Sequence, residues 1–137
     1  MTKTKQMRKV WTRRTIEAPA PEVWHLLTDT STWPVWGPSV RGATVNQPEL
    51  ALGATGTVDT IAGVRLPFEI TAFDAGCRWE WRVAGLAATD HVVRAVDERR
   101  CEVAFGVPVI AAPYLAVCRV ALHRIETLAT ERPGVPA

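Results

Sequence analysis

The sequence VPVIAAPYLAVCRVALHRIETLA, from Val107 to Ala129, decides the fold because its later part has the pattern of a long amphipathic helix. From Ala111 onward, apolar residues recur at spacings of three and four, which places them on one helical face. This face comprises Ala111, Tyr114, Leu115, Cys118, Ala121, Leu122, Ile125, Leu128 and Ala129. Pro113 is expected in or near the first turn, because a proline deeper in a helix removes a hydrogen bond. Such a helix, late in the chain, needs a concave sheet to cover its apolar face.

Strand-like segments fill the chain ahead of this helix. They combine branched and aromatic residues with polar ones, which favours β-strands, and glycines lie in several of the short connections. The predicted strands are Val10 to Ile16, Val40 to Val45, Thr55 to Ile61, Val64 to Phe73, Arg78 to Val83, Thr89 to Val96 and Cys101 to Val107. Because the later strands follow one another through short links, they predict an antiparallel meander.

Two short helices are expected between the first and second strands. Pro21 suits the first turn of a helix of about two turns. Residues 32–38 read TWPVWGP, and their two prolines allow only a single helical turn that ends at Gly37. That turn would set Trp33 and Trp36 side by side, where they either line the mouth of a barrel or pack in the core.

Alternation along the predicted strands assigns one face of the sheet to the interior. In residues 78–83 it turns Trp79 and Trp81 inward and the charged residues outward. In the strand from Thr89 to Val96 it turns His91 inward and Asp90 outward. We expect the charged outer set to face water in pairs that contribute roughly 0.2–1 kcal/mol each.

The composition fits a single domain. The 137 residues divide into a basic tail at 1–9, a domain at 10–130 and a frayed end at 131–137. A formal net charge of +2 is too small to indicate nucleic acid as a partner. Three cysteines without close spacing predict neither a disulfide framework nor a zinc site, and together with the lack of a signal-peptide pattern they favour the cytoplasm. The apolar run from Val103 to Leu122 holds two prolines and an arginine, so no membrane span is expected.

Several short motifs resemble one superfamily. They are Ile16-Glu17-Ala18-Pro19 with Pro21-Glu22-Val23-Trp24, Leu27-Thr28-Asp29 with Trp33-Pro34-Val35-Trp36, and Phe73-Asp74 with Trp79-Glu80-Trp81. With the closing helix, they resemble the START-related lipid-transfer and polyketide cyclase/dehydrase (SRPBCC) superfamily from about Val10 to Ala129. The resemblance implies an α+β helix-grip fold, in which a curved antiparallel sheet of about seven strands wraps around a long C-terminal helix, with two short helices after the first strand. It also implies an apolar cavity that holds a lipid, steroid, polyketide or other hydrophobic small molecule.

The inward-facing residues supply the candidate site. His91 is the best candidate for acid–base catalysis, with a hydrogen-bonded core histidine as the alternative. Tyr114 either orients a ligand or packs at the start of the helix. Cys118 and Cys101 are expected to fill space. The tryptophans either wall a ligand site or form a dry aromatic core. The predicted ligand-binding residues are Trp33, Trp36, Phe68, Trp79, Trp81, His91, Phe105, Tyr114 and Cys118, with Val58 and Ile61 as further candidates.

Three functions fit these observations. The first is binding of a hydrophobic small molecule in an internal cavity between sheet and helix. The second is a polyketide cyclase or dehydratase that uses His91 as its acid or base, and the third is a protein-interaction module that uses the outer sheet face. The lack of a paired acid and base among the inward residues favours the first. Nucleotide, phosphate, hydrolase and zinc motifs are absent, so neither a cofactor nor a metal is expected, and monomer and homodimer are both open.

Overall fold

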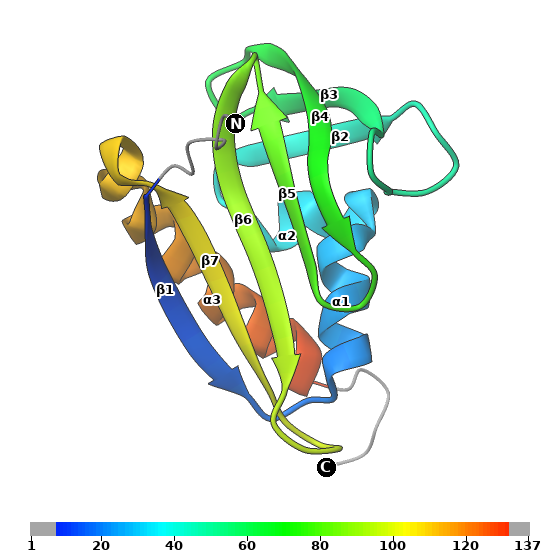
Figure 1. The fold of residues 1–137 in the computed structure, drawn as a ribbon, viewed down its shortest axis with the longest axis vertical. Coiled ribbons are helices and arrows are strands. Elements are labelled where there is room, and N and C mark those ends of the chain that lie inside the picture. The colour runs from blue at the N-terminus through cyan, green and yellow to red at the C-terminus, as the bar shows by residue number, and fades with distance from the viewer. Residues whose placement is uncertain (1–7, 132–137) are drawn as a thin grey trace, which may run out of the picture.

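The computed structural model describes residues 8–131, and within them a curved sheet wraps around the C-terminal helix (Figure 1). Seven strands form this sheet in the order β1-β7-β6-β5-β4-β3-β2, and all neighbours are antiparallel. The strands are β1 (Lys9–Ile16), β2 (Val40–Val45), β3 (Thr55–Thr60), β4 (Arg65–Asp74), β5 (Arg78–Val83), β6 (Leu86–Ala95) and β7 (Cys101–Pro108). The predicted α+β helix-grip fold is confirmed.

The helices lie where the sequence predicts them, before β2 and after β7. They are α1 (Ala20–Thr28), η1 (Thr30–Thr32), α2 (Trp33–Trp36), η2 (Val109–Tyr114) and α3 (Leu115–Thr130). The closing helix has two parts, a 3-10 segment and then the α-helix. Pro113 lies in the 3-10 segment, where its missing N–H removes no bond from the body of α3.

Two strands begin earlier than predicted. β1 starts at Lys9, which pairs with the last residue of β7. β6 starts at Leu86, because β5 and β6 are joined by a two-residue turn at Ala84 and Gly85. Both turn residues have positive φ, 52° and 81°, as in the tight hairpin turns that match the twist of a sheet. Ala84 is therefore an alanine in a conformation that favours glycine or asparagine.

The apolar face of α3 closes the core. Cys118, Leu122 and Ile125 are buried, and α3 packs against β1, β7, α1 and α2. Sheet strands supply the other side of the core, since Val103 and Phe105 point inward from β7, as alternation predicts. The predicted role of this helix as the element held by the sheet is confirmed.

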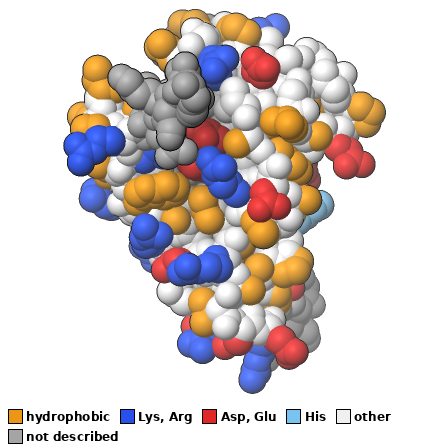
Figure 2. All heavy atoms as spheres, viewed as in Figure 1, with side chains coloured by type: hydrophobic (Ala, Val, Ile, Leu, Met, Phe, Trp, Pro, Cys, Tyr) orange, Lys and Arg blue, Asp and Glu red, His pale blue; other side chains and the backbone are white. Residues whose placement is uncertain are grey.

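The sheet face turned away from α3 carries basic and acidic side chains among hydrophobic ones (Figure 2). Asp90 lies here, yet its side chain is only 2% exposed. Lys9 Nζ lies 3.0 Å from one Asp90 oxygen and Arg78 Nε lies 2.9 Å from the other. Glu80 contacts the same two cations at 2.9 and 2.7 Å. The prediction that this charged set faces water is wrong for Asp90, because the long side chains of Arg78 on the adjacent strand β5 and of Lys9 on β1, one strand beyond β7, cover it.

Candidate functional site

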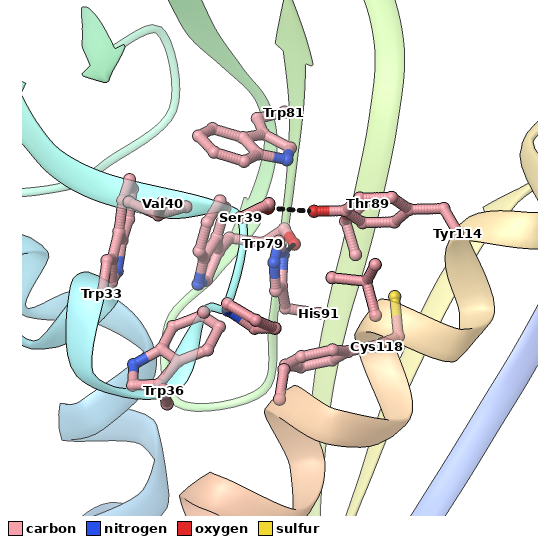
Figure 3. A pocket seen from close by; sticks show the side chains of 15 residues that line it. Trp33, Trp36, Ser39, Val40, Trp79, Trp81, Thr89, His91, Tyr114 and Cys118 are labelled. Carbon is pink, nitrogen blue, oxygen red and sulfur yellow. Dashed lines mark hydrogen bonds between the residues drawn. The ribbon is translucent and has the colours of Figure 1, made fainter. Parts of the chain in front are cut away.

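A cluster of aromatic rings lies inside the curve of the sheet (Figure 3). Trp79 of β5 and His91 of β6 are partners in the ladder, and their rings stack with centroids 3.8 Å apart. Trp33 of α2 also stacks with Trp79, at 5.3 Å and with 12° between the planes. Trp81 stands edge-on to both tryptophans, and Phe105 stands edge-on to His91. Residues from α2, β5, β6 and β7 thus meet in one aromatic cluster.

Two tryptophans of this region complete the end of α1. Trp33 Nε1 donates to the carbonyl of Leu27 at 3.0 Å, and Trp36 Nε1 donates to the carbonyl of Leu26 at 3.0 Å. The last carbonyls of a helix have no partner within the helix, so these indoles supply one. Trp33 and Trp36 therefore have a structural role, as the packing alternative anticipates, as well as facing the interior.

The His91 imidazole is buried and neutral at pH 7. Its Nδ1 lies 3.2 Å from the carbonyl oxygen of Trp79. Because a carbonyl only accepts, Nδ1 carries the proton, and Nε2 retains its lone pair. Burial lowers the pKa of His91 from 6.5 to about 4, although the bond to Trp79 and the charge of Asp90 oppose this change. His91 is therefore a weak base and has no second proton to give at neutral pH.

Two hollows adjoin the ring cluster. The inner one, between the rings and α3, has a volume of about 40 Å³. A cavity needs about 10–15 Å³ to hold one water molecule, so the inner hollow has room for only a few. The outer one has a volume of about 280 Å³ and lies among β3, β5, β6, β7 and η2. The space that the sequence assigns to a cavity is thus largely filled by aromatic rings near α3 and open near η2.

A hydrogen bond lies at the junction of the two hollows. The hydroxyls of Ser39 and Tyr114 are 2.6 Å apart (Figure 3). Both residues line both hollows, together with Val40, Trp81 and Thr89. The bond links the segment before β2 to the last residue of η2, where the linings of the two hollows overlap. Burial raises the pKa of Tyr114, so both hydroxyls are neutral at pH 7.

The structure brings most of the predicted ligand-binding residues together. Those that line the inner hollow are Trp33, Trp36, Trp79, Trp81, His91, Phe105, Tyr114 and Cys118. Phe68 lies outside both linings and packs behind them, with its ring 5.9 Å from Trp33 and 5.4 Å from Trp81. Val58 lines the outer hollow. Ile61 does not line it, because it lies in the exposed β3–β4 turn, and that expectation is wrong. Ligand binding by this set stays a prediction.

Sequence reasoning missed the polar residues of the junction. Thr89 was recoverable, because alternation turns it inward beside His91 on the same strand. Ser39 was not, because it meets Tyr114 across 75 positions of sequence and no local pattern marks such a pair. Val117 and Ala121 of α3 also line the inner hollow.

The lining of both hollows is electrically neutral. None of the lining residues is Asp, Glu, Lys or Arg, and His91 is uncharged at pH 7. Burial raises the pKa of the Cys118 thiol to about 11, and that of Cys101 likewise, so neither is a thiolate at neutral pH. Both cysteines thus occupy the interior as small apolar side chains.

Residues 8–131 contain neither a cluster of metal-binding side chains nor a membrane-spanning helix. No three His, Cys, Asp or Glu side chains gather there in a way that would hold a metal ion. Among the helices of this described part, none is long and apolar enough to cross a membrane.

Comparison with protein families gives a match over most of the chain. A model described as polyketide cyclase / dehydrase and lipid transport matches residues 7–121. The chain belongs to this family. The predicted membership in the superfamily is therefore confirmed. A search of curated proteins finds no match.

Several solved structures have a similar fold. A hypothetical protein from Helicobacter pylori has a TM-score of 0.72 and 14% identity, covering 94% of this chain and 99% of that chain. The protein XoxI from Bacillus cereus has a TM-score of 0.70 and 13% identity, covering 91% and 97%. The di-domain ARO/CYC BexL from the BE-7585A biosynthetic pathway has a TM-score of 0.70 and 14% identity, covering 88% of this chain and 46% of that one. At these identities the likeness extends to the fold alone.

Proposed function

We propose that the protein binds a hydrophobic small molecule in the outer hollow, with the aromatic cluster as its inner wall. One observation carries the proposal: a hollow of about 280 Å³ lies beside the half-buried indole ring of Trp81 and is lined by residues without formal charge. Ligand sites of this kind are mostly apolar and contain few polar groups. The family description, which includes lipid transport and polyketide cyclases, supports the same class of ligand.

The surroundings of the outer hollow also favour ligand entry from this end of the molecule. Leu86, Val109 and Ile110 are exposed, and each is adjacent in sequence to a residue that lines the hollow. Single exposed apolar residues are ordinary, but several beside one opening are typical of a place where an apolar molecule is received.

Binding without turnover is favoured over proton-transfer catalysis by His91. A catalytic base works best when its pKa lies near the operating pH, whereas burial lowers the pKa of His91 to about 4. A general acid must hold a proton to give, and at pH 7 the imidazole holds only the one that it donates to the Trp79 carbonyl. Cyclase or dehydratase activity with His91 as acid or base is therefore the second choice.

The proposal is tested by blocking the hollow. Ala87 lines it and is solvent-exposed, so Ala87→Trp should fill the space without disturbing the core. Ala95→Trp, at the exposed far end of the same strand β6, is the matched control, because Ala95 lines neither hollow. The ligand is N-phenyl-1-naphthylamine, a fluorescent probe that is apolar and uncharged. Its fluorescence is measured as each protein is added.

We expect the wild-type protein and Ala95→Trp to bind N-phenyl-1-naphthylamine equally, and Ala87→Trp to bind it at least about tenfold more weakly, since a filled pocket excludes the ligand. Native mass spectrometry of protein purified from its own host should reveal a retained small molecule. Equal binding by Ala87→Trp, or no binding by the wild-type protein, would overturn the proposal.

A further inference from the structure

Two buried indole N–H groups have no hydrogen-bond partner in the described part of the chain. They are Nε1 of Trp79 and Nε1 of Trp81. Their neighbours differ, because Trp33 and Trp36 donate their indole N–H groups to carbonyls of α1. Native proteins pair nearly all buried donors, so an unpaired donor in the lining of a hollow calls for a partner from outside the chain.

Trp81 is the better placed of the two to meet such a partner. It lines both hollows, whereas Trp79 lines only the inner one. In Figure 3 the nitrogen of Trp81 is on the side of its ring that faces the Ser39–Tyr114 hydrogen bond. The unpaired donor therefore points to the junction, where a ligand in the outer hollow would end.

From this geometry we propose that the ligand is an uncharged molecule that presents an oxygen acceptor, such as an aryl ketone, ester or quinone carbonyl, to Trp81 Nε1. This inference rests on the proposed function and assigns to Trp81 the role of a specificity-determining residue. An indole N–H only donates, so it selects an accepting group over a donating one.

The ligand is uncharged because nothing in the lining would compensate a charge. A carboxylate or phosphate would need a cation, and neither hollow is lined by lysine or arginine. An ammonium group would need a carboxylate; the buried one nearby, Asp90, lies on the outer sheet face and pairs with Lys9 and Arg78. The group of the ligand that lies at Trp81 is therefore not a carboxylate or another anion.

Three probes of nearly equal shape separate these requirements. 2-Ethylnaphthalene is apolar, 2-acetylnaphthalene carries a carbonyl oxygen, and 2-naphthoate carries oxygens together with a negative charge at pH 7.5. Their affinities are measured by competition with N-phenyl-1-naphthylamine. We expect the ketone to bind about tenfold more tightly than the hydrocarbon, as one hydrogen bond to an otherwise unpaired donor allows, and the carboxylate to bind more weakly than the ketone by at least the same factor.

Trp81→Phe removes the donor and keeps an aromatic ring. In this variant the ketone and the hydrocarbon should bind equally, and the ratio of the two affinities is the deciding result, because the smaller ring changes the apolar contact for both probes alike. Trp24→Phe is the control, because Trp24 packs against Phe73 outside both hollows, and it should keep the preference for the ketone. In the wild-type protein, the indole N–H resonance of Trp81 should move downfield with the ketone and not with the hydrocarbon, a measurement that does not depend on the folding of any variant.

The outcomes separate this inference from the proposed function. Equal binding of ketone and hydrocarbon by the wild-type protein, or a preference that survives in Trp81→Phe, overturns the inference and leaves hydrophobic binding intact. Tight binding of 2-naphthoate overturns the claim that the ligand is uncharged. Failure of all three probes and of N-phenyl-1-naphthylamine overturns both proposals together.

Discussion

Moderate acid is expected to destabilise this protein through a single buried side chain, His91. The folded protein holds the imidazole neutral with a pKa of about 4, whereas the ordinary value is 6.5. The unfolded chain therefore binds a proton more readily than the folded one. Because the folded pKa is the lower of the two, the stability that depends on neutral His91 is present above pH 6.5 and is lost as the pH falls toward 4.

The size of the loss follows from these two pKa values. Proton linkage gives a decrease in the free energy of unfolding of about 2 kcal/mol at pH 5 and about 3 kcal/mol at pH 4, relative to neutral pH. A domain of this size is stabilised by roughly 5–15 kcal/mol, so the loss is readily measured. Hydrogen bonds lower the pKa of Asp29 and Asp97 below 3.8, so these carboxylates reduce stability only at still lower pH. The interval from pH 6.5 to 5 therefore reports on His91.

Urea unfolding followed by circular dichroism at pH 7.5, 6 and 5 tests this reasoning. His91→Gln cannot take up a proton in this range, so its stability should change little with pH, although it should be lower at pH 7.5 by about 1–3 kcal/mol because a buried hydrogen bond is lost. His123→Gln replaces an exposed histidine and should follow the wild-type pH dependence. Equal pH dependence in His91→Gln and wild type, or a wild-type protein equally stable at pH 7.5 and 5, would refute it.

Further variants test the packing that positions the site. Leu122→Asp places an unpaired carboxylate in the core beneath α3 and should abolish soluble folding, while Val120→Asp, on the exposed side of the same helix, should stay soluble with a wild-type melting temperature. Gly56→Ala should reduce the free energy of unfolding by more than about 2 kcal/mol, because its Cβ would clash with the backbone oxygen of Thr44 in β2. Gly42→Ala, with nothing closer than 3.7 Å to the new Cβ, should cost less than about 1 kcal/mol in the same urea titration. Ala84→Asn should increase the free energy of unfolding by about 0.5–1 kcal/mol and so raise the melting temperature, since asparagine tolerates positive φ better than alanine. A lower melting temperature would contradict the turn geometry.

The element order and most of the inward set were predictable from local patterns. The helical spacing in α3 marks Cys118, Leu122 and Ile125 as buried, and alternation in β6 marks His91 as inward; both are local properties of a chain with period 3.6 or 2. The same reasoning did not predict the burial of Asp90. Alternation assigns its side of the sheet correctly but says nothing of whether Lys9 and Arg78 will cover it.

The state of the site required distances between elements far apart in sequence. The pKa of His91 depends on how completely Trp79 and Phe105 exclude water, and the junction depends on a contact between Ser39 and a residue of η2. Neither can be read from spacing, because burial and hydrogen bonding are set by the three-dimensional neighbours of each group.

By itself the sequence determined the curved sheet, the helix that it holds and the identity of most inward-facing rings, since hydrophobic periodicity specifies which face of each element is buried. Only the tertiary structure decided how much space those rings leave. The indole rings of Trp33, Trp36, Trp79 and Trp81 border the small inner hollow next to α3, and the larger open hollow lies toward η2 rather than along the helix. Volume left after packing is a property of all the neighbours together, and no single stretch of sequence carries it.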